Sequence, residues 1–185
     1  DRGIDRLVNR FLNDPVTHEV DSEQSPVEAM DHHVLHIDNS DRLGILKELC
    51  AAPGKTLVFT RTKHRADRLM KFLAAQDITV ERIHGNRSQN QRTEALGGFK
   101  SGKYRVLVAT DIAARGIDVT ALGHVINFDV PAAPEDYIHR VGRTARAQAT
   151  GFAITLVAPE EQSSLSDIER AIHARLPKQT LPGFD

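Results

Sequence analysis

Short apolar runs alternate with segments of helical periodicity along most of the chain. The apolar runs are bounded by polar or turn residues and cover 32–37, 56–60, 79–84, 105–110, 124–129 and 152–158. Runs of this length predict strands, and the continuously apolar ones are typical of strands buried in a parallel sheet. Between them, the spacing of apolar residues predicts helices over 40–50, 63–76, 88–100, 134–143 and 160–175, with Ser40 as a candidate N-cap of the first.

This alternation predicts an α/β fold, a three-layer sandwich with a mostly parallel sheet and helices on both faces. Ligands of such sheets bind beyond the carboxyl ends of the strands. We therefore expect functional side chains in the segments that follow Thr60, His84, Thr110 and Asp129.

The two ends of the chain do not follow the alternation. Residues 1–27 combine a short helical pattern, stopped near Asn13 by Pro15, with the polar linker "DSEQSPVE". We expect an appendage over 1–27, a single domain over 28–176 and a C-terminal tail over 177–185. The chain begins without a methionine, which favours a fragment of a longer protein.

Composition narrows the class of protein. A hydrophobic fraction of 40% in 185 residues supports a packed core. The single cysteine, Cys50, excludes a disulfide framework and fits a reducing compartment, so a cytoplasmic location is expected. No apolar run approaches the roughly 20 residues of a membrane helix.

The net charge of −1 excludes nucleic-acid binding by a wholly basic surface, but it leaves local patches open. Basic residues do gather in three places: at Arg61, Lys63, His64, Arg65 and Arg68; at Arg82, His84, Arg87 and Arg92; and at Arg140, Arg143 and Arg146.

Two motifs suggest chemistry that their context excludes. "PGKT" at 53–56 resembles the end of a phosphate loop, but the required first glycine is Leu49, and a helix precedes the motif where a strand should. "HHVLH" places His32 and His36 on one face of a strand roughly 13 Å apart, too far for one metal ion. We predict a turn for the first motif and no metal site for the second.

The segment "YIHRVGRTARA" at 137–147 concentrates charge on a nearly neutral chain. If 134–146 is helical, His139, Arg143 and Arg146 fall within an arc of about 60°, and Arg140 lies about 100° away. Like charges on one face repel unless an anion binds there, and planar guanidinium groups suit phosphate oxygens. A phosphate site is favoured over the alternative of a solvated basic helix face.

Three further segments present polar groups where strands end. "ATDIAARGIDV" at 109–119 offers the Arg115 guanidinium, the backbone amide of Gly116 and the Asp118 carboxylate, which suits a ribose hydroxyl. "VFTRTK" at 58–63 offers hydroxyls and cations. In "HGNRSQNQR" at 84–92, Gly85 can bring backbone amides near a phosphate at the start of a helix.

Together and in this order, the four segments closely resemble motif IV, the adjoining Gln-x-x-Arg element, motif V and motif VI of the C-terminal RecA-like domain of DEAD-box ATP-dependent RNA helicases. The resemblance covers about 28–158. Ala145 departs from the pattern, since most members carry glycine there. Within the family, "HRVGRTARAQATG" and the ending from Ala158 look most like the bacterial RhlE-type subfamily.

The resemblance implies a RecA-like fold and a role for each matching residue. Arg143 and Arg146 would be arginine fingers that reach ATP held, with Mg²⁺, mainly by an N-terminal RecA-like domain. His139, with Arg140 nearby, would couple the nucleotide to that domain, Asp118 would bind the ribose, and Arg115 would join the interdomain network. The RNA backbone would be held without reading of sequence by Thr62, Gly85, Gln89, Arg92, Thr110 and Gly116.

The full enzyme would close two domains on ATP and RNA and unwind short duplexes. The chain lacks a phosphate loop and a D-E-A-D box, so we expect it to be inactive alone. The appendage 1–27 would be a remnant of the preceding domain plus linker. Ribosome-assembly or RNA-decay proteins are the expected partners. A DNA helicase of the same superfamily and a standalone RNA-binding module remain alternatives, although His139 favours the RNA branch.

Overall fold

The computed structural model describes residues 31–115, 117, 122–142 and 152–179. Strands and helices alternate through this part of the chain, with a short 3₁₀ helix η1 before the last helix. The elements are β1 (Asp31–His36), α2 (Arg42–Ala51), β2 (Lys55–Phe59), α3 (Lys63–Ala74), β3 (Val80–Ile83), α4 (Gln89–Ser101), β4 (Val106–Ala109), α5 (Asp111–Ala114), β5 (Leu122–Asn127), α6 (Pro134–Val141), β6 (Phe152–Val157), η1 (Pro159–Glu161), α7 (Gln162–Ala171) and β7 (Lys178–Gln179).

The strands form one sheet in the order β3-β4-β2-β5-β6-β1-β7, and every neighbouring pair is parallel. The outermost strand, β7, has two residues that pair with Val34 and Leu35 of β1. The predicted α/β sandwich with a parallel sheet is confirmed, and the seventh strand was not expected from the sequence.

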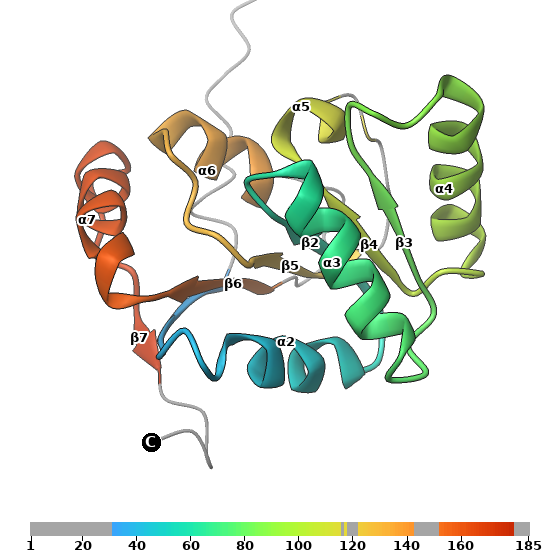
Figure 1. Ribbon diagram of the computed structural model, residues 1–185. Coiled ribbons are helices and arrows are strands. Elements are labelled where there is room, and N and C mark those ends of the chain that lie inside the picture. The colour runs from blue at the N-terminus through green and yellow to red at the C-terminus, as the bar shows by residue number, and fades with distance from the viewer. Residues whose placement is uncertain (1–30, 116, 118–121, 143–151, 180–185) are drawn as a thin grey trace, which may run out of the picture.

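Helices cover both faces of the sheet, as Figure 1 shows with α2 below it and α5 and α6 above it. On one face, α2 and α3 pack on alternate residues of the central strands, among them Val58, Val108 and Ile126. On the other face, α4 and α5 pack over Leu57 and Leu107, while α6 and α7 cover β1 and β6. Because both faces are covered, all four residues of β4 are buried, which explains its continuously apolar sequence.

Local capping interactions explain where several helices begin. Thr62 caps α3 by accepting a hydrogen bond from the Arg65 amide at 3.2 Å. Ser88 caps α4 and forms a reciprocal capping box with Gln91. At the end of α4, Gly102 adopts φ 86°, the left-handed conformation that glycine reaches without strain.

The predicted N-cap of the first helix is wrong. Asp41 occupies the N-cap position of α2 and makes no side-chain capping bond there. Residues 38–41 form a turn instead, in which the Asp41 amide donates to the carbonyl of Asp38 at 3.1 Å. The helix therefore begins at Arg42, whose buried side chain is held by carboxylates of distant segments.

The other helix limits differ from the predicted ones by a few residues. Helix α6 ends at Val141 rather than 143, and α7 covers 162–171 rather than 160–175. His173 adopts φ 54° just beyond α7, and the Glu169 carboxylate accepts the amide of Leu176 at 3.0 Å. Both features turn the chain from α7 toward β7.

Candidate functional site at the carboxyl ends of the strands

The carboxyl ends of β3, β4, β2 and β5 place the predicted polar residues along one edge of the sheet. His84, Thr110 and Thr60 follow β3, β4 and β2 in that order, and Asp129 follows β5. Thr60 and Asp129 are almost fully buried and joined by a hydrogen bond of 2.7 Å from the hydroxyl to the carboxylate. At this edge, Thr60 and Asp129 are therefore buried and hydrogen-bonded to each other, whereas other polar residues are accessible to a ligand.

Arg140 is a buried structural residue in this arrangement. Its Nε donates to Asp111 Oδ1 at 2.6 Å and its Nη2 to Asp111 Oδ2 at 2.8 Å, a bidentate ion pair. Its Nη1 donates to Asn127 Oδ1 at 3.1 Å and to the Asp129 carbonyl at 2.8 Å, and the guanidinium lies 5.1 Å from the Phe59 ring centroid. All three guanidinium nitrogens thus have protein partners, so Arg140 positions α6 against the strand ends.

A pocket of about 210 Å³ lies directly beside Arg140. Exposed Arg115, at the end of α5, and exposed His139, on α6, both line it, so the fold brings together two residues that are 24 positions apart. Its other lining residues are Phe59, Asp111, Ala114, Asp136 and Arg140. The pocket exposes the guanidinium of Arg115 and the imidazole of His139 beside the ring of Phe59. These two groups suit an anionic ligand.

Four of the predicted site residues lie outside the described residues: Gly116, Asp118, Arg143 and Arg146. The arc that would align Arg143 and Arg146 with His139 therefore stays a prediction.

The predicted RNA-binding residues that are described lie along the same edge. Thr62 caps α3, Gln89 is the first residue of α4, and Thr110 occupies the N-cap position of α5 without a side-chain capping bond. Arg92 donates from Nη2 to the Ala113 carbonyl at 3.4 Å, which ties α4 to α5. Gly85 is exposed, and a Cβ there would meet nothing within 4 Å, so the space above its backbone is open to a ligand.

A carboxylate beneath this row fixes the end of β3. Asp67 on α3 accepts from Arg82 Nε at 2.6 Å and lies 3.1 Å from His84 Nε2. Burial raises the pKa of Asp67, but the hydrogen bonds from Arg82 and His84 outweigh it and leave that pKa below its usual value. The amide of Asn86 donates to His84 Nδ1 at 3.3 Å, so His84 Nε2 is the ring nitrogen that donates to Asp67.

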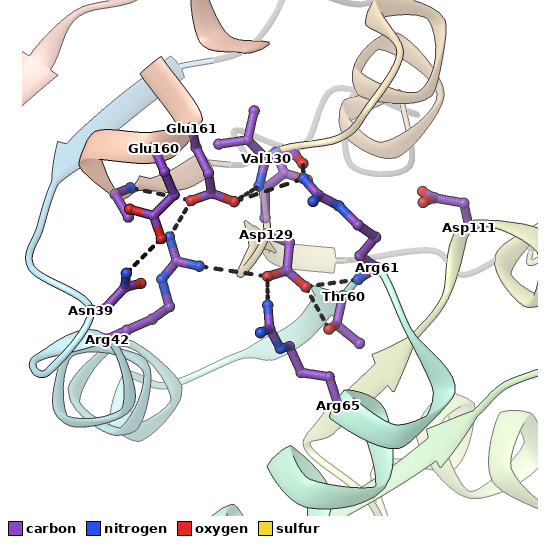
Figure 2. A network of polar contacts seen from close by, with 12 residues as sticks. Asn39, Arg42, Thr60, Arg61, Arg65, Asp111, Asp129, Val130, Glu160 and Glu161 are labelled. Atoms are coloured by element: carbon purple, nitrogen blue, oxygen red, sulfur yellow. Dashed lines mark hydrogen bonds and ion pairs between the residues drawn. The ribbon is translucent and has the colours of Figure 1, made fainter. Parts of the chain in front are cut away.

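The structure also contains an ion-pair network that the sequence did not predict (Figure 2). Asp129 accepts the Arg61 amide at 2.8 Å, is paired with Arg65 and lies 3.5 Å from Arg42 Nη1. Arg42 also pairs with Glu161, whose carboxylate accepts the amides of Val130 at 3.1 Å and Ala158 at 3.2 Å. The partners lie up to 119 positions apart, so the only sequence signal was the basic cluster around Arg61 and Arg65.

"PGKT" is confirmed as a turn: it connects α2 to β2, and Gly54 adopts φ 106° there. Because it precedes β2, it lies at the opposite end of that strand from the pocket. His32 of "HHVLH" is buried and hydrogen-bonded through Nδ1 to the Tyr137 hydroxyl at 2.8 Å. In the described part of the chain, no helix is long and apolar enough to cross a membrane.

The parallel sheet, its two helical layers and the row of polar residues at its carboxyl edge define a RecA-like α/β domain. The family model described as "Helicase conserved C-terminal domain" matches residues 41–148. The chain therefore belongs to the helicase C-terminal domain family, as the C-terminal helicase domain of a DEAD-box protein.

Known proteins support this assignment. The chain is 40% identical to the DEAD-box ATP-dependent RNA helicase CshA of Geobacillus kaustophilus over 98% of its own length, but it spans only 39% of that relative. The crystal structure of Escherichia coli DEAD-box protein SrmB bound to regulator of ribonuclease activity A is similar with a TM-score of 0.77 and 34% identity, covering 82% of this chain and 91% of that one. S. cerevisiae Dbp5 bound to RNA and ADP BeF3 is similar with a TM-score of 0.80 and 27% identity, covering 98% and 49%.

Proposed function

We propose that this chain is the C-terminal half of an ATP-dependent RNA helicase that unwinds short RNA duplexes when two RecA-like domains close. The observation that carries the proposal is the pocket that Arg115 and His139 both line. It lies on the same sheet edge as the predicted RNA-binding residues. An enzyme that couples ATP hydrolysis to RNA unwinding needs a nucleotide site next to its RNA-binding residues.

The pocket residues fit the phosphates of ATP. Arg115 and His139 are exposed, whereas Arg140 is buried in its ion pair with Asp111, so we assign Arg140 a positioning role. Arg143 and Arg146 supply the arginine fingers in this proposal, and Asp118 binds the ribose. Bound Mg²⁺, held with ATP mainly by the N-terminal domain, offsets the negative charge of the phosphates.

An apolar side chain beside the pocket supports contact with a second domain. Ile112 on α5 is 76% exposed and lies between residues that line the pocket. A single exposed apolar residue is ordinary by itself, but this one lies on the face that a second domain would cover if it closed over the pocket. The N-terminal RecA-like domain is the partner that the proposed mechanism supplies.

RNA is the proposed nucleic acid, held through its backbone by Thr62, Gly85, Gln89, Arg92, Thr110 and Gly116. The described members of this set lie on loops and helix starts at one edge of the sheet. The RNA-bound state of Dbp5, a protein with the same fold, supports the choice of ligand.

The subfamily, the cellular location and the protein partners are also proposed, each from the sequence or from the relatives. The RhlE-type subfamily is proposed from the sequence "HRVGRTARAQATG" and the C-terminal segment, whereas the CshA relatives carry another name. A cytoplasmic location and partners in ribosome assembly or RNA decay are proposed from the bacterial relatives and from the regulator of ribonuclease activity bound to SrmB.

The proposal is tested by ATP hydrolysis with and without single-stranded RNA. We expect no turnover from this chain alone, and RNA-stimulated turnover when the upstream domain is part of the same protein. In that longer protein, Arg143→Ala lowers turnover on the order of 10³-fold. Arg170→Ala, a matched change at an exposed position of α7, leaves the ATP turnover unchanged.

Three results would contradict the proposal. RNA-stimulated turnover by this chain alone would show that no second domain is needed. Equal stimulation by DNA would favour a DNA translocase. RNA binding without any nucleotide turnover in the longer protein would favour a standalone binding module.

A further inference from the structure

A second, larger pocket of about 430 Å³ opens at the same edge of the sheet, on the face covered by α2 and α3. Its walls come from the N-terminal parts of these two helices, from η1 and from Phe128 after β5. Four arginines and two glutamates line it: Arg42, Arg61, Arg65, Arg68, Glu160 and Glu161. None of these residues has a role in the function proposed above.

The buried charges of this pocket balance one another, but those at its rim do not. Arg42 and Arg65 are held by Asp129 and Glu161 within the network of Figure 2. The Arg61 side chain is half exposed, and among the described residues it donates one hydrogen bond, from Nη2 to the Val130 carbonyl at 2.9 Å, and lies 3.9 Å from Glu161. Arg68 is exposed and makes no hydrogen bond or ion pair in the described part of the chain. Because a guanidinium carries five N–H donors, both residues retain free donors.

The start of α3 increases the positive potential at this rim. Its first turn contains Lys63, His64 and Arg65 and no acidic residue. The helix dipole disfavours cations at an N-terminus. The Asp129 carboxylate, which accepts the Arg61 amide and pairs with Arg65, offsets only part of this positive charge because it is shared with Arg42. Glu160 does not neutralise the rim, because it accepts from Asn39 Nδ2 at 2.6 Å and lies on the far side of the network from Arg61 in Figure 2.

The order of the strands shows which of the predicted RNA-binding residues lies next to the pocket. Along the edge, Gly85 follows β3, Thr110 follows β4 and Thr62 follows β2, and the next strand is β5. Phe128, in the wall of the pocket, comes directly after β5. Arg61, which also lines the pocket, directly precedes Thr62, so the pocket adjoins the end of the proposed RNA track.

We propose that this pocket binds a further backbone phosphate of the same RNA strand, through Arg61 and Arg68 at its rim. The inference rests on the proposed function, because it extends the RNA track from Thr62. An acidic peptide would also satisfy two guanidinium groups, but RNA is favoured because the proposed track ends at Thr62, directly beside Arg61 in the wall of the pocket. Arg65, paired with Asp129, forms the fixed wall between the track and the pocket.

The test measures binding of fluorescently labelled oligouridylates of about four and about eight nucleotides to the 185-residue chain by anisotropy, over a range of salt concentrations. The variant is Arg61→Gln with Arg68→Gln, since neither side chain donates a hydrogen bond to a buried carboxylate and Arg61 lies 3.9 Å from Glu161, which Arg42 also holds. Arg170→Gln with Arg175→Gln is the charge-matched control on the far segment around α7. Arg92→Gln reports on the proposed RNA track itself, and urea unfolding verifies that each variant is folded.

We expect the double variant to lose about tenfold in affinity for the longer RNA at about 50 mM salt, with its salt slope reduced by about 0.7 for the one phosphate lost, and to bind the shorter RNA normally. Arg92→Gln weakens the binding of both RNAs, and the control pair changes neither.

Two results would overturn this inference alone: unchanged binding of both RNAs by the double variant while Arg92→Gln weakens them, or an equal loss for both lengths. Binding of poly-glutamate, but not of RNA, through Arg61 and Arg68 would assign the pocket to a protein partner and overturn it as well. If neither RNA binds the parent chain at low salt, the RNA track and the inference both fail.

Discussion

At the scale of single residues, the structure separates arginines that hold the fold from arginines that are open to ligands. Arg140 is 2% exposed and satisfied by protein acceptors, whereas Arg115 and Arg68 are exposed. The sequence shows both kinds in similar clusters, because charge patterns do not reveal which guanidinium meets a buried carboxylate. The resemblance of the segment to motif VI placed Arg140 near the nucleotide beside His139, and it gave no sign that the guanidinium is buried.

Replacing Arg140 by methionine should lower the free energy of unfolding by about 3 kcal/mol, because it leaves Asp111 and the buried amide oxygen of Asn127 without their donor. Urea unfolding followed by circular dichroism measures the change. Arg170→Met is the matched control, since its ion pair with Asp167 is exposed and should be worth less than about 0.5 kcal/mol. Equal stability of the two variants would show that Arg140 has no structural role.

At the scale of elements, residues close in sequence were enough to predict most helices and strands. All six predicted strands are present within a few residues of their expected limits, because each is a continuous apolar run between turns. The elements that were missed are short: α5 has four residues and β7 has two, too few for any periodicity. Helix α2 began two residues late because its first residue, Arg42, is held by Asp129 and Glu161, and contacts at that distance leave no local pattern.

Two neighbouring glycines in α4 should respond oppositely to alanine. A Cβ on Gly98 would overlap the ring of Tyr104, whereas a Cβ on Gly97 would meet nothing within 4 Å. Gly97→Ala should therefore raise the free energy of unfolding by about 0.5–1 kcal/mol, because alanine favours the helix and restricts the unfolded chain. Gly98→Ala should lower it by about 1–2 kcal/mol. Chemical denaturation of both variants under one condition decides the matter, and equal shifts would contradict the packing of Tyr104 on α4.

Asp67 joins α3 to the end of β3 through Arg82 and His84, and its pKa is lowered in the folded protein. A carboxyl with a lowered folded pKa stabilises the protein above its unfolded pKa, and this contribution is lost as the pH falls through the folded pKa. Asp67→Asn should thus be less stable than the parent near neutral pH, with the difference shrinking below about pH 4. Thermal unfolding at a series of pH values tests this, and a difference independent of pH would assign the loss to packing instead.

At the scale of the whole molecule, the sequence predicted the position of the site, but it did not predict the ion pairs that fix the site residues in place. The rule that ligands bind beyond the carboxyl ends of parallel strands placed Thr60, His84, Thr110 and Asp129 correctly at one edge. It could not show that Asp129 joins the two faces of the sheet. The Asp129 carboxylate pairs with Arg65 of α3, while its carbonyl accepts from Arg140 of α6 on the opposite face.

This position makes Asp129 the common support of both pockets, and its replacement by asparagine tests that. The amide keeps the shape of the side chain but removes the charge that balances Arg42 and Arg65, so we expect a loss of about 3–5 kcal/mol in the free energy of unfolding. Asp167→Asn on exposed α7 should change it by less than about 0.5 kcal/mol.

Hydrogen exchange separates this local role from a general loss of stability. The Arg61 amide donates to the Asp129 carboxylate, whereas the Val108 amide lies in the central strand β4. In Asp129→Asn, the Arg61 amide should lose more protection than the fall in global stability accounts for, and the Val108 amide should lose only that amount. Equal losses at both amides would mean that Asp129 stabilises the domain without organising this edge, and the two pockets would then be independent of each other.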